Sequence, residues 1–195
     1  PVDLTDLALT TVYFVRHAES DMRVREDRAR PLTAKGLADS ARLAEWFRPI
    51  SIDHIYSSPY LRAWQTLSDL AALKGLDIQP VEDFRERQNF GWIANFNDHL
   101  KWLWEDFNHC KSGEEAMRQV QNRAVAALER LLEAQAGKTL VIGTHGTALS
   151  MMINHYDPKF RFEDFMNIKN VMPWVVMAQF DHKELIGMKE MIVLE

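Results

Sequence analysis

An arginine and a histidine stand side by side at Arg16 and His17, directly after the apolar run Thr11–Val15. A run of β-branched and aromatic residues followed by polar ones is typical of a buried strand that ends in a loop. Ligand sites of open α/β sheets lie just outside the carboxyl ends of such strands. A fixed positive charge beside a titratable nitrogen nucleophile at that position favours phosphate chemistry.

Two further strand-like runs end in residues that suit the same chemistry. The run at 52–56 leads to Arg62 on the first turn of a following helix, and the run at 139–143 leads to His145. We therefore expect these two side chains to converge with the Arg-His pair around one phosphate dianion.

Each of these side chains has an expected role in phosphoryl transfer. Arg16 and Arg62 would bind the phosphate, because a planar guanidinium donates two parallel hydrogen bonds to its oxygens. His145 would contact the same oxygens if it is protonated. His17 would attack the phosphorus, since an imidazole with a pKa of about 6.5 is largely neutral near pH 7. The attack would give a phosphohistidine, with the other ring nitrogen held by a backbone carbonyl or a similar acceptor.

The chain resembles the histidine phosphatase superfamily, in its phosphoglycerate mutase-like branch 1, between about residues 12 and 150. The resemblance implies that His17 is the nucleophile and that His145 and Glu86 are catalytic. In the family's order, the matching segments are Arg16-His17-Ala18-Glu19-Ser20, Leu32-Thr33-Ala34-Lys35-Gly36, 57–66, Phe84-Arg85-Glu86 with Phe90-Gly91-Trp92, and Gly143-Thr144-His145-Gly146.

A carboxylic acid is expected near the leaving oxygen, because the departing alkoxide needs a proton. Glu86 is our candidate, since Phe84-Arg85-Glu86 resembles a family segment whose Glu acts as an acid and later as a base. Glu82, Asp83 and Asp98 are rival acids, and a surface salt bridge is the alternative interpretation of Glu86.

Two positions depart from the family's pattern. Mutase-like members carry a phosphate-binding Asn six positions after the nucleophile, and Arg23 stands there in this chain. Arg23 would either bind phosphate as a charged replacement or point to solvent, and we favour the pocket. A family Gln that follows the Gly36 position is replaced by Asp39.

Strand-like and helix-like segments alternate along the chain, which predicts an α/β fold with a mostly parallel central sheet flanked by helices on both faces. The resemblance implies a phosphoglycerate mutase-like three-layer sandwich with a small helical cover over the pocket. Helices are predicted at about 33–48 and 59–74 and from a capping box at Ser112 to about 137, and further strands at 77–81, 173–180 and 189–194.

Residues 1–195 are predicted to form a single histidine phosphatase-like domain, with 92–111 as a cover or insertion segment. Aromatic side chains such as Trp102, Trp104 and Phe107 are too numerous in this segment for one stripe of a helix. Some of them would line the substrate entrance; the alternative is ordinary packing.

The composition is that of a globular protein, with 47% hydrophobic and 26% charged residues. A net charge of −5 argues against a nucleic-acid or membrane-surface binder. The single cysteine, Cys110, fits a reducing compartment, and without a recognisable signal peptide or spanning stretch we expect a cytoplasmic location. The C-terminal segment 188–194 could pair across a homodimer or simply end the sheet.

No step of this chemistry requires a metal or a cofactor, and the remaining histidines show no short ligand spacing. The predicted function is a metal-independent phosphomonoesterase acting on a small-molecule phosphate monoester. The segment after Glu86 is short and rich in aromatics, which favours hydrolysis over mutase activity. A phosphoglycerate mutase-type phosphotransferase and a non-catalytic phospho-ligand binding protein are the alternatives.

Overall fold

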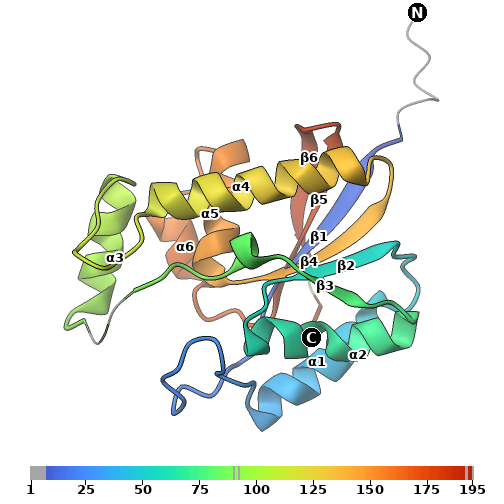
Figure 1. Cartoon of the computed structure of the whole chain (residues 1–195), viewed down its shortest axis with the longest axis horizontal. Coiled ribbons are helices and arrows are strands. Elements are labelled where there is room, and N and C mark those ends of the chain that lie inside the picture. The colour runs from blue at the N-terminus through green and yellow to red at the C-terminus, as the bar shows by residue number, and fades with distance from the viewer. Residues whose placement is uncertain (1–7, 90, 92, 192, 195) are drawn as a thin grey trace, which may run out of the picture.

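A six-stranded sheet with the strand order β3-β2-β4-β1-β5-β6 forms the centre of the computed structural model, which describes residues 8–89, 91, 93–191 and 193–194 (Figure 1). The strands are β1 (Thr10–Arg16), β2 (His54–Ser57), β3 (Ile78–Pro80), β4 (Thr139–Thr144), β5 (Trp174–Asp181) and β6 (Glu184–Met191). The helices are α1 (Ala34–Phe47), α2 (Leu61–Lys74), α3 (Phe96–Glu105), α4 (Met117–Ala134), α5 (Gly146–Tyr156) and α6 (Phe162–Ile168), with a short 3-10 helix η2 (Glu82–Phe84).

The sheet is mixed. Strands β3, β2, β4 and β1 run parallel, whereas β5 is antiparallel to both β1 and β6. The prediction of a mostly parallel sheet is therefore wrong. Part of the reason is local: β5 and β6 are joined by a tight turn at His182 and Lys183, and so short a connection links only antiparallel strands.

Helices cover both faces of the sheet, as predicted (Figure 1). Side chains of β1 alternate between the two faces, as the pleat of a strand requires. Val12 and Phe14 pack in the core that α4 and α5 complete, and Tyr13 and Val15 pack in the core that α1 and α2 complete. Strand β1 is buried on both faces, which explains its uninterrupted apolar run.

Local sequence signals explain the ends of α1 and α2. Thr33 caps α1, because its hydroxyl accepts a hydrogen bond from the backbone N–H of Gly36 at 3.0 Å. Helix α2 ends at Gly75, whose φ of 63° lies in the left-handed region that favours glycine.

Two predicted boundaries are wrong. Helix α4 begins at Met117 rather than at Ser112, and the side chain of Gln119 caps it by accepting the N–H of Ala116 at 2.8 Å. Strand β6 begins at Glu184 rather than at Lys189, because strand pairing resumes directly after the tight turn. Residue 192, within the predicted strand, lies outside the described residues.

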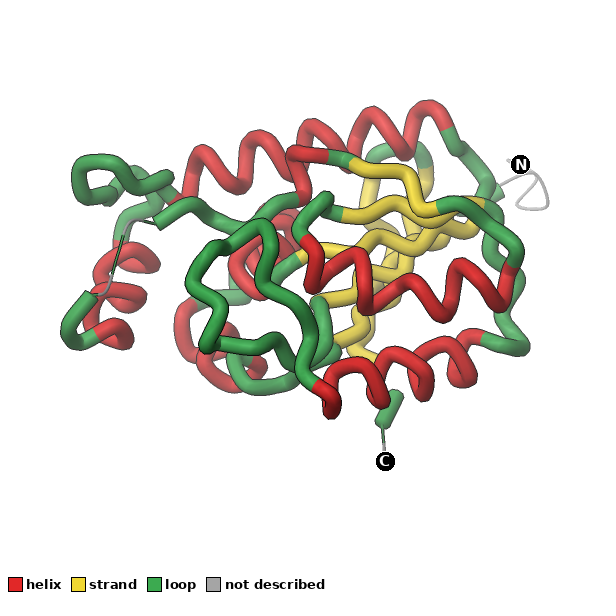
Figure 2. Tube along the Cα trace, turned by 60° about the horizontal axis from the view of Figure 1, so that its bottom comes forward, coloured by secondary structure: helices red, strands yellow, loops and turns green. Residues whose placement is uncertain are grey.

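The carboxyl ends of β1, β2 and β4 lie next to one another, and this edge positions the functional residues. Arg16 at the end of β1 is level with Thr144 of β4, and Ser57 of β2 is level with Gly143. Figure 2 shows the connection from β1 to α1 as a broad loop beside these strand ends. In the described part of the chain, no helix has the length and apolarity needed to cross a membrane.

Candidate active site

His17 follows the last residue of β1 and is held in one tautomer. Its Nδ1 lies 2.7 Å from the carbonyl oxygen of Ala18. A carbonyl only accepts hydrogen bonds, so Nδ1 carries the proton and Nε2 keeps its lone pair. Nε2 in turn accepts a hydrogen bond from Nε of Arg62 at 3.3 Å. The expected backbone acceptor for His17 is thus present, and it leaves Nε2 as the nucleophilic atom.

Arg62 enters the site from the first turn of α2, and its side chain is only 4% exposed. Besides His17, it contacts the loop between β1 and α1. Its Nη1 donates to the carbonyl oxygen of Asp27, and its Nη2 pairs with the Asp27 carboxylate at 3.1 Å. A carboxylate therefore occupies part of the fork with which Arg62 would bind a phosphate.

Arg16, the last residue of β1, is buried under the end of α6. Its Nη1 donates to the carbonyl oxygens of Ile168 and Lys169, both at 2.8 Å. Gly146 permits this position, since a Cβ there would approach Cζ of Arg16 to 3.0 Å. Burial lowers the pKa of Arg16 to about 10, so the side chain is still charged at neutral pH.

His145 follows β4 and lies across from His17, with the two ring centroids 5.3 Å apart. Its Nε2 lies 2.8 Å from Oγ of Ser58. Its Nδ1 and the Nε of Arg16 are both buried and have no hydrogen-bond partner among the described residues. The Nε of Arg16 always carries a hydrogen and can donate it to an acceptor such as a phosphate oxygen, and Nδ1 of His145 can do the same when it carries the ring proton.

Burial lowers the pKa of both histidines well below 6.5, and the positive charge of Arg62 lowers each further. His17 is therefore neutral at pH 7, as a nucleophile must be. His145 is neutral as well, so its expected role as a cation holds only if a bound phosphate dianion raises its pKa again.

We expect the His17 imidazole to stay unprotonated as the pH falls from 7 to 6.5. A lowered pKa means that the neutral form persists to lower pH, so protonation begins only as the pH approaches that lowered value. An NMR titration of 13C-labelled histidine in the free protein measures the midpoint. The His17→Asn variant assigns the resonance, and a midpoint of 6.5 or above would contradict the prediction.

Glu86 lies at the N-terminus of α5, directly beyond His145. One carboxylate oxygen accepts the N–H of Thr147 at 3.0 Å, and the other accepts those of Ala148 and Arg87 at 3.1 and 2.8 Å. A negative charge is favourable at the positive end of a helix. The negative charge of Glu86 also raises the pKa of Arg16, which offsets part of the decrease that burial causes.

The rival acids have other partners or positions. Glu82 pairs with Arg28, Asp83 pairs with Arg130 at 3.2 Å, and Asp98 lies on the exposed side of α3. Of the four carboxyl groups weighed from the sequence, Glu86 is therefore the one that meets the helix after His145.

Arg23 is not brought into this cluster. Its side chain is 91% exposed and pairs with Asp21 of the same loop at 2.8 Å. The favoured pocket role for Arg23 thus finds no support, and the solvent-facing alternative describes its position. Asp39 is buried in α1, where it pairs with Lys35 at 2.6 Å and with Arg42 at 3.5 Å.

Sequence reasoning missed Asp27. Its loop stands out in the sequence for arginines, and no local signal distinguishes its aspartate from a solvated one. Only the tertiary structure shows its contact with Arg62.

Replacing Asp27 with asparagine should tighten phosphate binding. The substitution removes a negative charge that competes with phosphate for Arg62, so we expect KM for an aryl phosphate and Ki for inorganic phosphate to fall by roughly 3- to 10-fold. Asp21→Asn is the matched control, because Asp21 lies in the same loop but pairs with the exposed Arg23. Unchanged or higher constants in Asp27→Asn would mean that the carboxylate does not compete with phosphate.

Helix α3 lies at the end of the molecule toward which the parallel strands run (Figure 1). Trp104 and Phe107 are buried and pack against each other and near Phe165, so these two aromatics belong to the core. Phe96 is 41% exposed, and the ammonium group of Lys169 lies 5.5 Å from the centre of its ring. Residues 90 and 92, part of the resemblance and of the predicted cover, lie outside the described residues.

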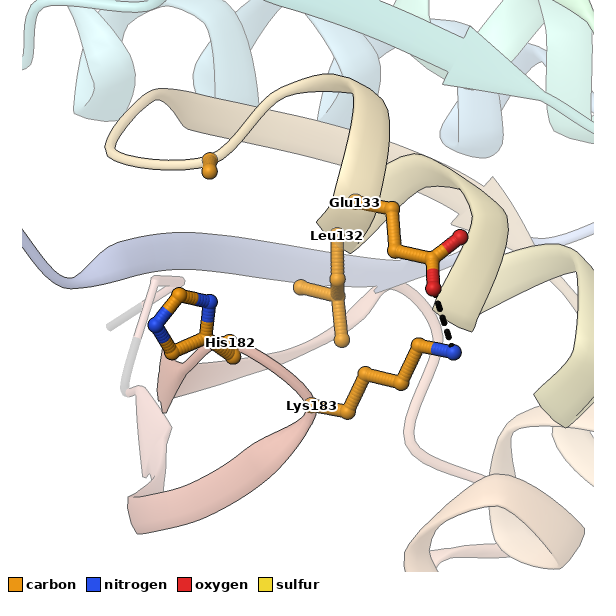
Figure 3. A pocket seen from close by; sticks show the side chains of 5 residues that line it. Leu132, Glu133, His182 and Lys183 are labelled. Atoms are coloured by element: carbon orange, nitrogen blue, oxygen red, sulfur yellow. Dashed lines mark ion pairs between the residues drawn. The ribbon is translucent and has the colours of Figure 1, made fainter.

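A separate hollow of about 450 Å³ lies at the opposite end of the sheet (Figure 3). It lies between the end of α4 and the turn that joins β5 to β6, where Lys183 pairs with Glu133 at 2.6 Å. Strand β5 enters that turn beside Thr10 at the start of β1, whereas Arg16 stands at the other end of β1. This hollow is thus remote from the histidines.

The described residues contain no cluster of three or more His, Cys, Asp or Glu side chains arranged to hold a metal ion. Arg16 and Arg62 bring positive charge to His17, and the charge of Arg30 lowers the pKa of His17 as well.

A model of the histidine phosphatase superfamily (branch 1) matches residues 12–184 of the chain. A probable phosphoglycerate mutase GpmB of Salmonella typhi is 30% identical over 158 residues, which are 73% of this chain and 73% of that protein.

Solved structures with the same fold include a Bacillus protein and two phosphatases. Bacillus stearothermophilus YhfR is 23% identical with a TM-score of 0.74, over 90% of this chain and 94% of that one. A mycobacterial glucosyl-3-phosphoglycerate phosphatase is 16% identical with a TM-score of 0.75, over 93% and 97%. A phosphoserine phosphatase mutant of Entamoeba histolytica, bound to phosphoserine, is 19% identical with a TM-score of 0.72, over 92% and 96%.

Proposed function

The chain belongs to the histidine phosphatase superfamily (branch 1), and from this premise we propose that it is a metal-independent phosphomonoesterase. Its substrate is a small phosphate monoester, and the reaction passes through a phosphohistidine on His17. One observation carries the proposal: the lone pair on Nε2 of His17 is held beside Arg62, since Nδ1 donates to the Ala18 carbonyl.

In the first step, Nε2 of His17 forms a bond to phosphorus while the bond from phosphorus to the leaving oxygen breaks. The free site holds Glu86 as a carboxylate, so in this step it takes up a proton together with the substrate and gives that proton to the leaving oxygen. An alcohol then departs rather than an alkoxide. Arg16 and Arg62 stabilise the charge on the phosphoryl oxygens, and the unpartnered Nδ1 of His145 supplies a further contact.

In the second step, the Glu86 carboxylate takes a proton from a water molecule as that water attacks the phosphorus. The bond from phosphorus to His17 breaks, inorganic phosphate leaves, and His17 returns to its neutral form. The carboxylate is suited to this task because the N-terminus of α5 orients both of its oxygens.

Hydrolysis is preferred over mutase activity because the segment after Glu86 is short, rich in aromatic residues and carries few cations that could retain a phosphorylated intermediate. Arg87 is buried, donates to the carbonyl oxygen of Glu115 at 2.9 Å and lies 3.8 Å from the Glu114 carboxylate. The 30% identity to a probable phosphoglycerate mutase favours the mutase as the second candidate.

Turnover of p-nitrophenyl phosphate in the presence of EDTA tests the proposal. We expect release of one phosphate per nitrophenol, and acid-labile, alkali-stable label on the protein after quenching with 32P-labelled substrate. With labelled 3-phosphoglycerate, transfer between hydroxyl positions that outpaces phosphate release would favour the mutase. Binding of phosphate esters without any turnover would favour a non-catalytic binding protein.

A further inference from the structure

The guanidinium of Arg123 on α4 binds the backbone of the segment that carries Glu86. Its Nη1 donates to the carbonyl oxygens of Asp83 and Arg85 at 2.7 and 2.9 Å, and its Nη2 donates to that of Glu86 at 3.2 Å. Two further bonds, at 2.7 and 2.9 Å, go to the Glu115 carboxylate. The side chain is only 10% exposed. One largely covered guanidinium group thus binds three carbonyl groups of a single short segment.

The same segment is held from its other side by the strand and helix that flank His145. Thr144 donates its hydroxyl to the carbonyl oxygen of Phe84 at 2.8 Å, and the Glu86 carboxylate accepts the N–H groups of Thr147 and Ala148. Glu86 is therefore held at two points. Its backbone carbonyl binds Arg123 of α4, and its carboxylate binds the N-terminus of α5.

The carboxylate of Glu115 completes the attachment. It accepts two N–H groups of Arg123 and, at 3.2 Å, the backbone N–H of Gln88. The N–H of Glu115 donates to the carbonyl oxygen of Gln88 at 2.9 Å. Arg123 and Glu115 thus hold the chain on both sides of Glu86.

We propose that Arg123 is a positioning residue for Glu86, which sets the carboxyl group in place for both proton transfers without touching the substrate. The inference rests on the proposed function, because it assigns Arg123 to the acid and base of that reaction. Five directional donors in one plane are needed for three carbonyls and a carboxylate, and a lysine ammonium supplies only three from a single point.

Arg123→Lys is the informative variant. It keeps the positive charge, which lowers the pKa of His145, but it removes the planar guanidinium and its five N–H donors. We expect kcat/KM for an alkyl phosphate to fall by roughly 10- to 100-fold, since small displacements of a catalytic group cost that much. For p-nitrophenyl phosphate, whose leaving group needs no proton, kcat/KM should fall by less than about 3-fold. A residue that served stability alone would lower both values equally.

Arg130→Met is the matched control. Arg130 also lies on α4 and also contacts Asp83, but only through an exposed ion pair of side chains. Its ratio of alkyl to aryl kcat/KM should equal that of the wild type. If thermal unfolding shows that Arg123→Lys does not fold, Glu115→Gln is measured in its place, because it weakens the ion pair that orients the Arg123 guanidinium.

A double-mutant cycle with Glu86→Gln decides whether Arg123 acts through Glu86. We expect Glu86→Gln with Arg123→Lys to be no slower on the alkyl phosphate than Glu86→Gln alone. If the two substitutions lower kcat/KM independently, so that their effects multiply, the inference about Arg123 is wrong and the proposed function stands. The same holds if folded Arg123→Lys keeps the wild-type ratio of alkyl to aryl kcat/KM. If Glu86→Gln itself showed no dependence on the leaving group, the proposed acid would be wrong and the inference would fail with it.

Discussion

His17→Ala is expected to lower phosphatase activity by roughly 10⁴-fold or more, because loss of a nucleophile removes the covalent path and leaves only transition-state binding. Arg16, Arg62 and His145 would remain, so inorganic phosphate should still bind. The measurements are kcat with p-nitrophenyl phosphate and labelling of the quenched protein with 32P.

Two controls make the His17 result specific. His155→Ala removes an exposed histidine on α5 and should leave activity unchanged. Free imidazole should partly restore turnover in His17→Ala, since the vacated volume admits the nucleophile that was removed. Full activity without imidazole, or label still attached to the variant, would refute a phosphohistidine at His17.

Glu86→Gln is expected to separate substrates by their leaving groups. For an alkyl phosphate, kcat/KM should fall by about 10²- to 10⁴-fold, the usual contribution of a general acid. For p-nitrophenyl phosphate the fall should be small, because the phenolate departs without a proton. The slope of log(kcat/KM) against leaving-group pKa measures the effect, and it should become steeper in the variant.

Asp83→Asn provides the comparison for Glu86→Gln, because Asp83 lies on the same segment but pairs with the surface residue Arg130. It should leave the slope unchanged. Glu86→Gln should also lower stability by about 0.5–1 kcal/mol, since the N-terminus of α5 loses a negative charge while one amide oxygen still accepts a hydrogen bond. Equal slopes in the wild type and Glu86→Gln would exclude Glu86 as the acid.

The histidines of the site are neutral, whereas its arginines are charged. Burial favours the uncharged form of His17, whereas Arg16 keeps its proton at neutral pH even with a pKa lowered to about 10. The site therefore combines an unprotonated nitrogen, Nε2 of His17, with fixed positive charge, which an exposed cluster of the same residues would not do near pH 6.

Local patterns in the sequence were sufficient for the elements that end at the site. Apolar runs identified β1, β2 and β4, and parallel neighbours that end at one edge bring Arg16, His17, Arg62 and His145 together. Such features depend on residues a few positions apart, whose spacing alone determines which backbone conformation is favourable.

Contacts between distant parts of the chain decided the rest. The antiparallel placement of β5 beside β1, the pairing of Asp27 with Arg62 and the binding of three carbonyls by Arg123 each join residues far apart in the sequence. The protonation states of the histidines depend on burial, which exists only once both faces of the sheet are covered. Pairing energies and desolvation are properties of the packed molecule, so a linear pattern of residue types does not contain them.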